Sequence, residues 1–384
     1  MTEGARYEQA VVRAVTGSPV ASPPPPRMRV VRAAGRRILG VLLLLTATVV
    51  VLIGGLCAAL FTVLSAPWRP RLGRARRVVA IAAVYARTEI AGLAVAAWRW
   101  VHFLVNRDAA RDRRERVQAL TTALNALRSA ADRFGGLDVV LTRSSADEGG
   151  EQDADSLKLP AGPLIVCGRH GGIGGAFLLA HILLADYGRL PRVVLKQTLS
   201  WDPLIDALLS RIPHAFINPQ PDDRGATAAR IGDLAEGMDP TDALLIFPEG
   251  GNFTPSRRIH AIRRLRRRGL AHAAAHAEKL QNVLPPHPDG LFAAIEAAPE
   301  SDVVFVAHTG LEHLQSAAHV VRSLPLREPV EITWWSVPAA KVPTETAARV
   351  GWLEENWSRI DRWVAASGGA GLLGGEAAGA EGGG

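Results

Sequence analysis

Cysteine and lysine are both scarce in this chain of 384 residues. Only two cysteines occur, Cys57 and Cys167, and they lie in different regions of the sequence. Two separated cysteines provide neither a disulfide framework nor the paired spacing of a zinc site. We therefore expect the globular part to work in a reducing compartment. Because lysine is rare, arginine carries most of the positive charge behind the formal net charge of +7, and such a surface suits nucleic acid, anionic lipid or a phosphorylated substrate.

Charged residues are absent between Ile38 and Ala66. A helix needs about 20 apolar residues to cross the hydrocarbon core of a bilayer, and this run is longer. It is also longer, and lies further from the N-terminus, than the apolar core of a signal peptide. The run therefore predicts a transmembrane segment at residues 36–66. Gly54 and Gly55 near its centre leave a re-entrant loop as an alternative.

A second apolar stretch, from Val78 to Val105, is interrupted by charged residues. Either it crosses the membrane again, or it lies in the interface with Trp98 and Trp100 at the level of the headgroups, and we favour the interface. Arginines flank the 36–66 segment on both sides, so the positive-inside rule gives no orientation. With the cysteine content, we expect a cell-membrane protein whose globular domain faces the cytoplasm.

The remaining sequence divides by composition. Residues 1–35 form a basic, proline-rich leader, residues 67–133 a helical juxtamembrane region, residues 134–366 the globular domain, and residues 367–384 a disordered tail rich in glycine and alanine. In the globular domain, apolar runs alternate with helical patterns such as Ala176–Tyr187, Leu204–Ser210 and Ala226–Leu234. The predicted strands are Leu137–Leu141, Leu164–Cys167, Arg192–Leu195, Ala215–Ile217, Ala243–Phe247, Val303–Ala307 and Val330–Trp335. This alternation predicts an α/β fold with a mostly parallel sheet flanked by helices.

Three of the predicted strands run into segments that are suited to chemistry. The first ends in a glycine-rich turn that begins with His170, and glycines allow a ligand to approach the backbone closely. The second ends in Pro248-Glu249-Gly250 and is followed by an arginine-rich helix. The third ends at His308, for which a structural role is favoured over a place in the active site. Ligands of parallel sheets bind beyond the carboxyl ends of strands, so these segments are the candidate site.

The first two segments resemble motifs of the glycerolipid acyltransferase superfamily, which includes the 1-acylglycerol-3-phosphate acyltransferases. Phe247-Pro248-Glu249-Gly250 is similar to the third motif of that family, and His170 stands 79 residues earlier at the place of the first motif. The resemblance covers roughly residues 137–340. It implies a fold like that of glycerol-3-phosphate acyltransferase, and transfer of a fatty acyl group to 1-acyl-sn-glycerol-3-phosphate in phospholipid synthesis.

The resemblance also implies roles for individual residues. His170 is the general base that removes a proton from the acceptor hydroxyl, and imidazole suits this task because its pKa lies near 6.5. Glu249 and Gly250 form the turn that binds the acceptor, with Arg257 and Arg258 as ligands of its phosphate. Acyl-CoA or acyl carrier protein is the acyl donor, and no metal or resident cofactor is implied. The expected partners are therefore membrane lipid, acyl-CoA and a lysophospholipid.

Two positions depart from the pattern of the family. The first motif has an aspartate five residues after the histidine, and here that position is Gly175. Asp186 or Asp202 could replace the aspartate in space. The alternative function is that of a catalytically degenerate protein, which binds lipid or acyl-CoA without turnover. The second motif usually ends in a charged residue, where this chain has Asn218. The basic helix lacks interleaved aromatic residues, so we expect no nucleic-acid partner.

Overall fold

The structure, a computed structural model, describes residues 72–106, 109–142, 158–172, 174–196, 213–217 and 224–367. The predicted leader, the predicted transmembrane segment at 36–66, the predicted helix Leu204–Ser210 and the predicted tail beyond residue 367 lie outside these ranges. Within them, no helix combines the length and the apolar character that crossing a membrane requires, and this includes the helix that contains Val78–Val105.

A sheet of seven strands forms the centre of the described part of the chain, in the order β1-β7-β6-β2-β5-β3-β4. Its strands are β1 (Val139–Leu141), β2 (Leu164–Gly168), β3 (Leu190–Lys196), β4 (His214–Ile217), β5 (Asp242–Ile246), β6 (Asp302–His308) and β7 (Val330–Val337). Neighbouring strands are parallel except for β6 and β7, which are antiparallel. The predicted α/β fold with a mostly parallel sheet is thus confirmed.

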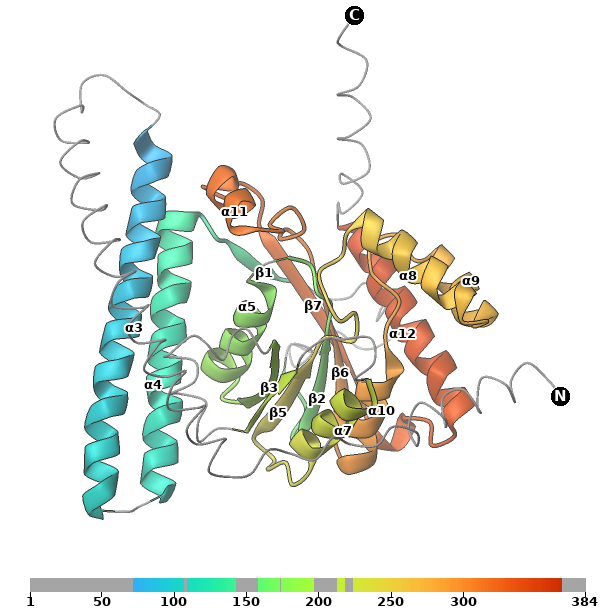
Figure 1. Cartoon of the computed structure of the whole chain (residues 1–384), viewed down its shortest axis with the longest axis horizontal. Helices are drawn as coiled ribbons and strands as arrows, with labels where there is room; N and C mark the ends of the chain where they lie inside the picture. The colour runs from blue at the N-terminus through green and yellow to red at the C-terminus, as the bar shows by residue number, and fades with distance from the viewer. Residues whose placement is uncertain are drawn as a thin grey trace, which may run out of the picture.

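Helices cover both faces of this sheet (Figure 1). The elements of one layer are α7 (Arg224–Ala235), α10 (Pro288–Ala297) and α12 (Thr346–Ala366), and those of the other are α5 (Gly175–His181) and the π-helical turn η4 (Ile182–Asp186). Alternate residues of β2 point to opposite faces: Ile165 packs with α10 and α12, whereas Val166 packs with α5. Both faces are apolar, and this explains why the central strands appear as continuous apolar runs in the sequence.

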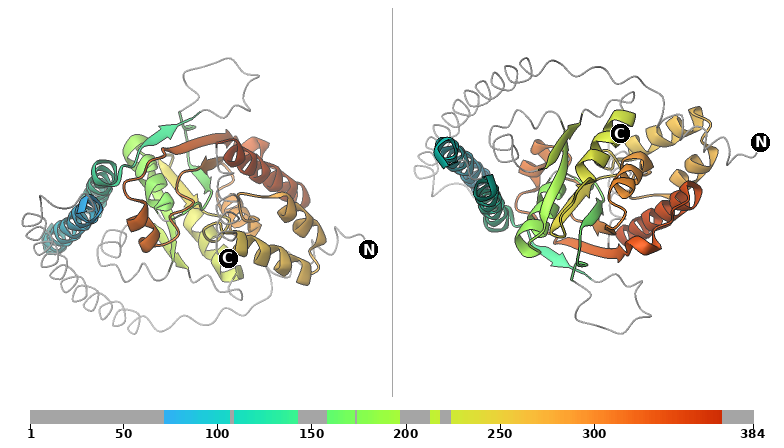
Figure 2. Two further views of the ribbon diagram at one scale, coloured as in Figure 1. Left: turned by 90° about the horizontal axis from the view of Figure 1, so that it is seen from above. Right: turned by 90° about the horizontal axis from the view of Figure 1, so that it is seen from below.

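Two further helical pairs flank the layered core. Helices α3 (Leu72–Asn106) and α4 (Ala109–Ala130) lie side by side on one flank, where α4 packs through Leu124 against Leu184 and Leu190. Helices α8 (Pro255–Arg267) and α9 (Ala271–Lys279) lie on the opposite flank beside α12 (Figure 2). The shorter elements are the π-helical turn η1 (Ala131–Gly135), α11 (Ala317–Ser323) and the 3-10 turn η6 (Ala339–Lys341).

Candidate active site

The topology of the sheet brings the three chemically unusual strand ends together. Strand β2 lies between β5 and β6, with Cys167 paired to Ile246 and Gly168 paired to Val306. All three strands are parallel, so their carboxyl ends open on the same edge of the sheet. His170 follows β2, Glu249 follows β5, and His308 ends β6. The strand order could not be inferred from the sequence, and it is the strand order that creates the site.

Backbone hydrogen bonds on both sides of His170 hold it in place. Its N–H donates to Glu249 Oε1 at 3.2 Å, and its carbonyl oxygen accepts from the N–H of Phe253 at 3.0 Å. The imidazole ring is half-buried and lies 5.0 Å from the ring of Phe247, centroid to centroid, at a tilt of 47°. The loop after β2 and the loop after β5 are therefore bonded into one unit, with the His170 ring resting on Phe247.

The carboxyl group of Glu249 joins three loops. Its side chain is almost fully buried, with 3 % exposed, and its second oxygen accepts from the N–H of Leu284 at 3.4 Å. Burial raises the pKa of Glu249 to about 8, although the positive charge of Arg169 and the two backbone N–H donors act in the opposite direction. Both carboxyl oxygens thus contact backbone amides of the protein. This places the predicted binding residue Glu249 in the support of the His170 loop.

Gly250 completes the turn after β5. Its N–H donates to the carbonyl oxygen of Phe247 at 3.0 Å, and its φ of 67° is in the left-handed region that glycine adopts without strain. The carbonyl of Pro248 accepts from the N–H of His287 at 2.9 Å, so the turn is also tied to the segment before α10. Gly250 is therefore a requirement of the backbone at this turn.

The arginines at the start of α8 have different surroundings. The hydroxyl of Thr254 caps the helix by accepting from the N–H of Arg257 at 3.2 Å. The side chain of Arg257 is exposed and donates through Nη1 to the carbonyl of Asn252 at 3.1 Å, close to the turn. Arg258 donates instead to the backbone carbonyls of Glu278 and Leu280, at the C-terminal end of α9. Of the two predicted phosphate ligands, the structure thus places Arg257 at the surface and Arg258 in a structural position.

A buried ionic cluster lies behind the His170 loop and was not recognised from the sequence. The side chain of Arg169 is completely buried and forms a salt bridge with Glu312. Its Nη1 also donates to the carbonyl of His308 at 2.6 Å, and its Nη2 donates to the carbonyl of Asn282 at 2.9 Å. One signal was present in the sequence, because an arginine at the end of an apolar strand must find partners if it is buried.

Other reactive groups near this edge of the sheet are inert or unsuited to bind metal. The thiol of Cys167 is buried in β2, and burial raises its pKa well above the ordinary range, so that it is not a nucleophile. In the ranges that the structure describes, no group of three His, Cys, Asp or Glu side chains is placed to hold a metal ion. Asp202 and Asn218 lie outside these ranges.

Comparison with known proteins matches part of the chain to one family model. Residues 152–307 match the family model described as Acyltransferase, and this segment includes His170, Glu249 and all the strands from β2 to β6 except the last residue of β6. The chain carries an acyltransferase domain. Searches of the curated proteins and of the solved structures gave no match.

An imidazole ring packs beside Gly175, the position where the resemblance to the family implies an aspartate. Gly175 is the first residue of α5, and a Cβ added to it would lie 3.2 Å from both Cε1 and Nε2 of His308. His308 is 1 % exposed, and its Nε2 donates to the carbonyl of Arg169 at 2.9 Å. Burial, followed by the charge of Arg169, lowers the pKa of His308 to about 4. A neutral ring therefore packs against Gly175.

Asp186, one of the two carboxylates considered as a replacement for the missing aspartate, does not lie beside Gly175. Asp186 ends η4, eleven residues after Gly175 along a continuous helical segment. The α-helical part from Gly175 to His181 alone spans about 9 Å at a rise of 1.5 Å per residue, and Asp186 lies beyond it. The charge of Asp186 instead acts on His181 and Tyr187, near the other end of the helix.

Proposed function

We propose that this acyltransferase domain transfers a fatty acyl group from acyl-CoA or acyl carrier protein to a lysophospholipid, most simply 1-acyl-sn-glycerol-3-phosphate. The observation that carries the proposal is the position of His170. Its ring is half-buried at a strand end, and its backbone is bonded on both sides to the turn that contains Glu249. A held backbone and the contact with Phe247 limit where the ring can lie, and a general base must be positioned within reach of the acceptor hydroxyl.

The chemistry that follows is a single acyl transfer. The acceptor hydroxyl gives its proton to the imidazole of His170 while its oxygen attacks the carbonyl carbon of the thioester. The tetrahedral intermediate then collapses, and the carbon–sulfur bond breaks. The leaving thiolate takes the proton from the imidazolium, so the products are a new ester and a free thiol. No metal or resident cofactor takes part in this scheme.

The exposed arginines of α8 support a phosphorylated acceptor at a membrane surface. Arg257 lies beside the Glu249 turn, and Arg263, Arg266, Arg267 and Arg268 are exposed further along or just after the same helix. Repulsion among these charges contributes, after burial, to a lowered pKa of Arg264. A face of this kind attracts anionic headgroups. We therefore place the domain on the cytoplasmic side of the cell membrane, where lysophospholipid is delivered from the bilayer.

An acyl-transfer assay on the purified full-length protein tests the mechanism. His170→Ala should lower kcat/KM by about a hundredfold or more, since general bases contribute roughly 10²–10⁴. The matched control is His272→Ala, which removes an exposed imidazole from α9. Turnover that survives His170→Ala would show that the base is elsewhere.

A second candidate function is binding of lipid or acyl-CoA without turnover. It is favoured by one observation, the contact between Gly175 and His308 where the family has a carboxylate. The two functions differ in a simple measurement. Wild-type protein that binds acyl-CoA but transfers no acyl group, under conditions where a family enzyme is active, would support binding alone.

Membrane attachment is tested separately from catalysis. The full-length protein should resist extraction by alkaline carbonate because of the uncharged run from Ile38 to Ala66. A variant that lacks residues 1–66 should lose this resistance and keep at most salt-sensitive binding through α8. Release of the intact protein by high salt alone would contradict the anchor.

A further inference from the structure

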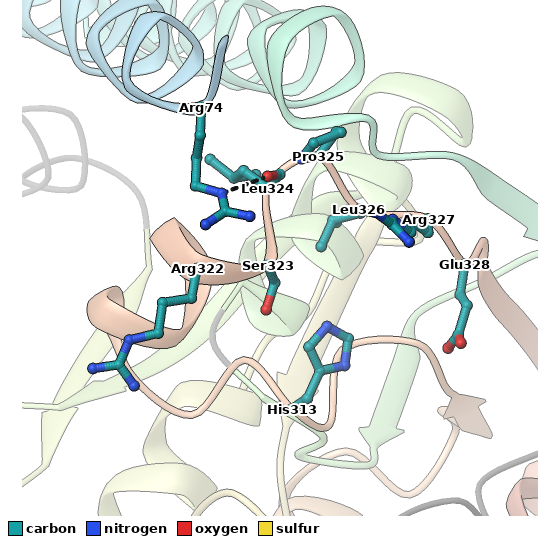
Figure 3. Close-up of a pocket in the computed structure, with 9 residues that line it drawn as sticks. All are labelled: Arg74, His313, Arg322, Ser323, Leu324, Pro325, Leu326, Arg327 and Glu328. Carbon is teal, nitrogen blue, oxygen red and sulfur yellow. Dashed lines mark hydrogen bonds between the residues drawn. The ribbon is translucent and has the colours of Figure 1, made fainter. Parts of the chain in front are cut away.

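A pocket of about 430 Å³ lies between the start of α3 and the segment that follows α11. Figure 3 shows Arg74 approaching from α3, Arg322 and Ser323 from the end of α11, and His313 from the loop after β6. The complete lining is Arg74, His313, Arg322, Ser323, Leu324, Pro325, Leu326, Arg327 and Glu328. The volume is in the range of pockets that bind small molecules or headgroups. None of these residues belongs to the acyl-transfer site described above.

The lining of the pocket is strongly cationic. Three arginines face a single carboxylate, that of Glu328, and His313 adds a further exposed donor. Among the residues that the structure describes, none of these arginines takes part in a salt bridge. A pocket lined by three guanidinium groups and only one carboxylate has a positive potential, which attracts an anion.

The walls of the pocket are held firmly. The Nε of Arg74 donates to the carbonyl of Leu324 at 3.2 Å, which leaves the forked end of its guanidinium for a ligand (Figure 3). The N–H of Leu326 donates to the carbonyl of Gly135 at 2.7 Å, and Arg77 donates to the carbonyl of Phe134 at 3.1 Å. The pocket therefore lies where the α3–α4 pair contacts the sheet domain.

We propose that this pocket binds a phosphate group, contributed by an anionic lipid headgroup or by a soluble phosphorylated molecule such as CoA. Guanidinium forks match the geometry of phosphate oxygens, and the hydroxyl of Ser323 adds a neutral donor. The headgroup is the better supported source. Arg74 stands only eight residues (74 − 66 = 8) after the end of the uncharged run at Ala66, a chain length that reaches at most roughly 29 Å.

Titration calorimetry on the full-length protein in an uncharged detergent tests this proposal. The three ligands are a short-chain phosphatidic acid, CoA and inorganic phosphate. Arg322→Gln/Arg327→Gln should weaken binding by about tenfold or more, which is the effect of losing a charge-assisted hydrogen bond. The control, Arg114→Gln/Arg362→Gln, removes the same charge from exposed positions on α4 and α12 and should change affinity by less than about twofold.

The pattern across ligands identifies the source of the phosphate. Loss confined to phosphatidic acid supports a headgroup site, and loss confined to CoA or inorganic phosphate supports a site for a soluble molecule. Glu328→Gln removes the one carboxylate of the pocket and should tighten binding, a gain that misfolding cannot produce. Unchanged affinities in the Arg322/Arg327 variant, or an equal loss in the control, would overturn the proposal. Phosphatidic acid and CoA are also products of the proposed acyl transfer and can bind beside His170, so the change in affinity caused by Arg322→Gln/Arg327→Gln, and not binding itself, reports on this pocket.

Discussion

Replacement of Gly175 by aspartate is the sharpest perturbation of the acyltransferase site. Gly175 begins α5, and its backbone is not in the left-handed region, so aspartate can adopt its φ without strain. The obstacle is steric and electrostatic. The added Cβ would lie 3.2 Å from two ring atoms of His308, which must then move by a few tenths of an ångström.

The expected size of the effect follows from other enzymes with an orienting aspartate. In serine proteases, loss of that aspartate lowers turnover by about 10⁴, which corresponds to about 5.5 kcal/mol at 1.36 kcal/mol per decade. Overpacking costs roughly 1–3 kcal/mol, and a carboxylate beside a buried neutral ring adds a desolvation penalty. We therefore expect Gly175→Asp alone to be destabilised by roughly 1–3 kcal/mol and to gain less than about tenfold in kcat/KM, because the carboxylate is displaced.

A second substitution removes the obstacle. His308→Asn is shorter, and its amide ends near the position of the ring Nδ1, so it clears the new carboxylate but gives up the bond from Nε2 to the carbonyl of Arg169. Gly175→Asp/His308→Asn should recover part of the lost stability and raise kcat/KM by about a hundredfold or more. His308→Asn alone should not raise it. Gly351→Asp on α12, where nothing lies within 4 Å of the new Cβ, controls for a helical glycine replaced by aspartate.

Acyl-transfer kinetics and urea denaturation of the same preparations decide between the outcomes. A large gain in Gly175→Asp without loss of stability would show that His308 does not block the position. No gain in the double variant would refute the idea that a carboxylate at residue 175 orients His170.

Three further predictions concern the surrounding loops. Arg257→Ala should raise the KM for a phosphorylated acceptor roughly ten- to a hundredfold, the effect of about 1.5–3 kcal/mol, whereas Arg258→Ala should lower stability by removing bonds to two carbonyls; equal changes in KM would contradict this division. The stability of Glu249→Gln relative to wild type should rise as the pH increases from about 4.5 to about 8. The folded carboxyl keeps its proton to about pH 8 and the unfolded one releases it near 4.5, so wild-type stability falls across that window. A stability difference between the two proteins, measured by urea denaturation, that stays constant with pH would refute the assignment. Arg169→Met should cost about 3–5 kcal/mol because Glu312 is left buried without its partner, and Arg169→Met/Glu312→Gln should recover part of this loss; a single variant as stable as wild type in urea would contradict the cluster.

Much of the fold could be predicted from the sequence because buried parallel strands are recognisable locally. The strand predicted at Leu164–Cys167 is found at Leu164–Gly168, and the strand predicted at Val303–Ala307 is found at Asp302–His308. Both are continuous apolar runs followed by turn residues, and such a run needs no knowledge of distant partners. The predicted helix Ala176–Tyr187 is present in outline, although its second half is the π-helical turn η4.

The pairings between distant side chains could not be predicted. Arg169 and Glu312 are separated by 143 residues, and nothing in the local sequence of either one names the other. Arg257 and Arg258 are adjacent and chemically identical, yet Arg257 is exposed and Arg258 is partly buried. The difference comes from their positions around the first turn of α8. Local patterns specify an element, whereas a contact depends on where the whole sheet places that element.

Gly175 and His308 are best explained as a complementary pair. A glycine at the start of α5 leaves room for a ring, and the ring is fixed because its Nε2 bonds to the carbonyl of Arg169. Arg169 is in turn held by Glu312 and by two carbonyls, so the ring cannot move without disturbing a buried charge. Restoring a family-like aspartate at residue 175 is therefore not a local change. It acts on the cluster that supports the His170 loop, which is why stability and turnover must be measured on the same variants.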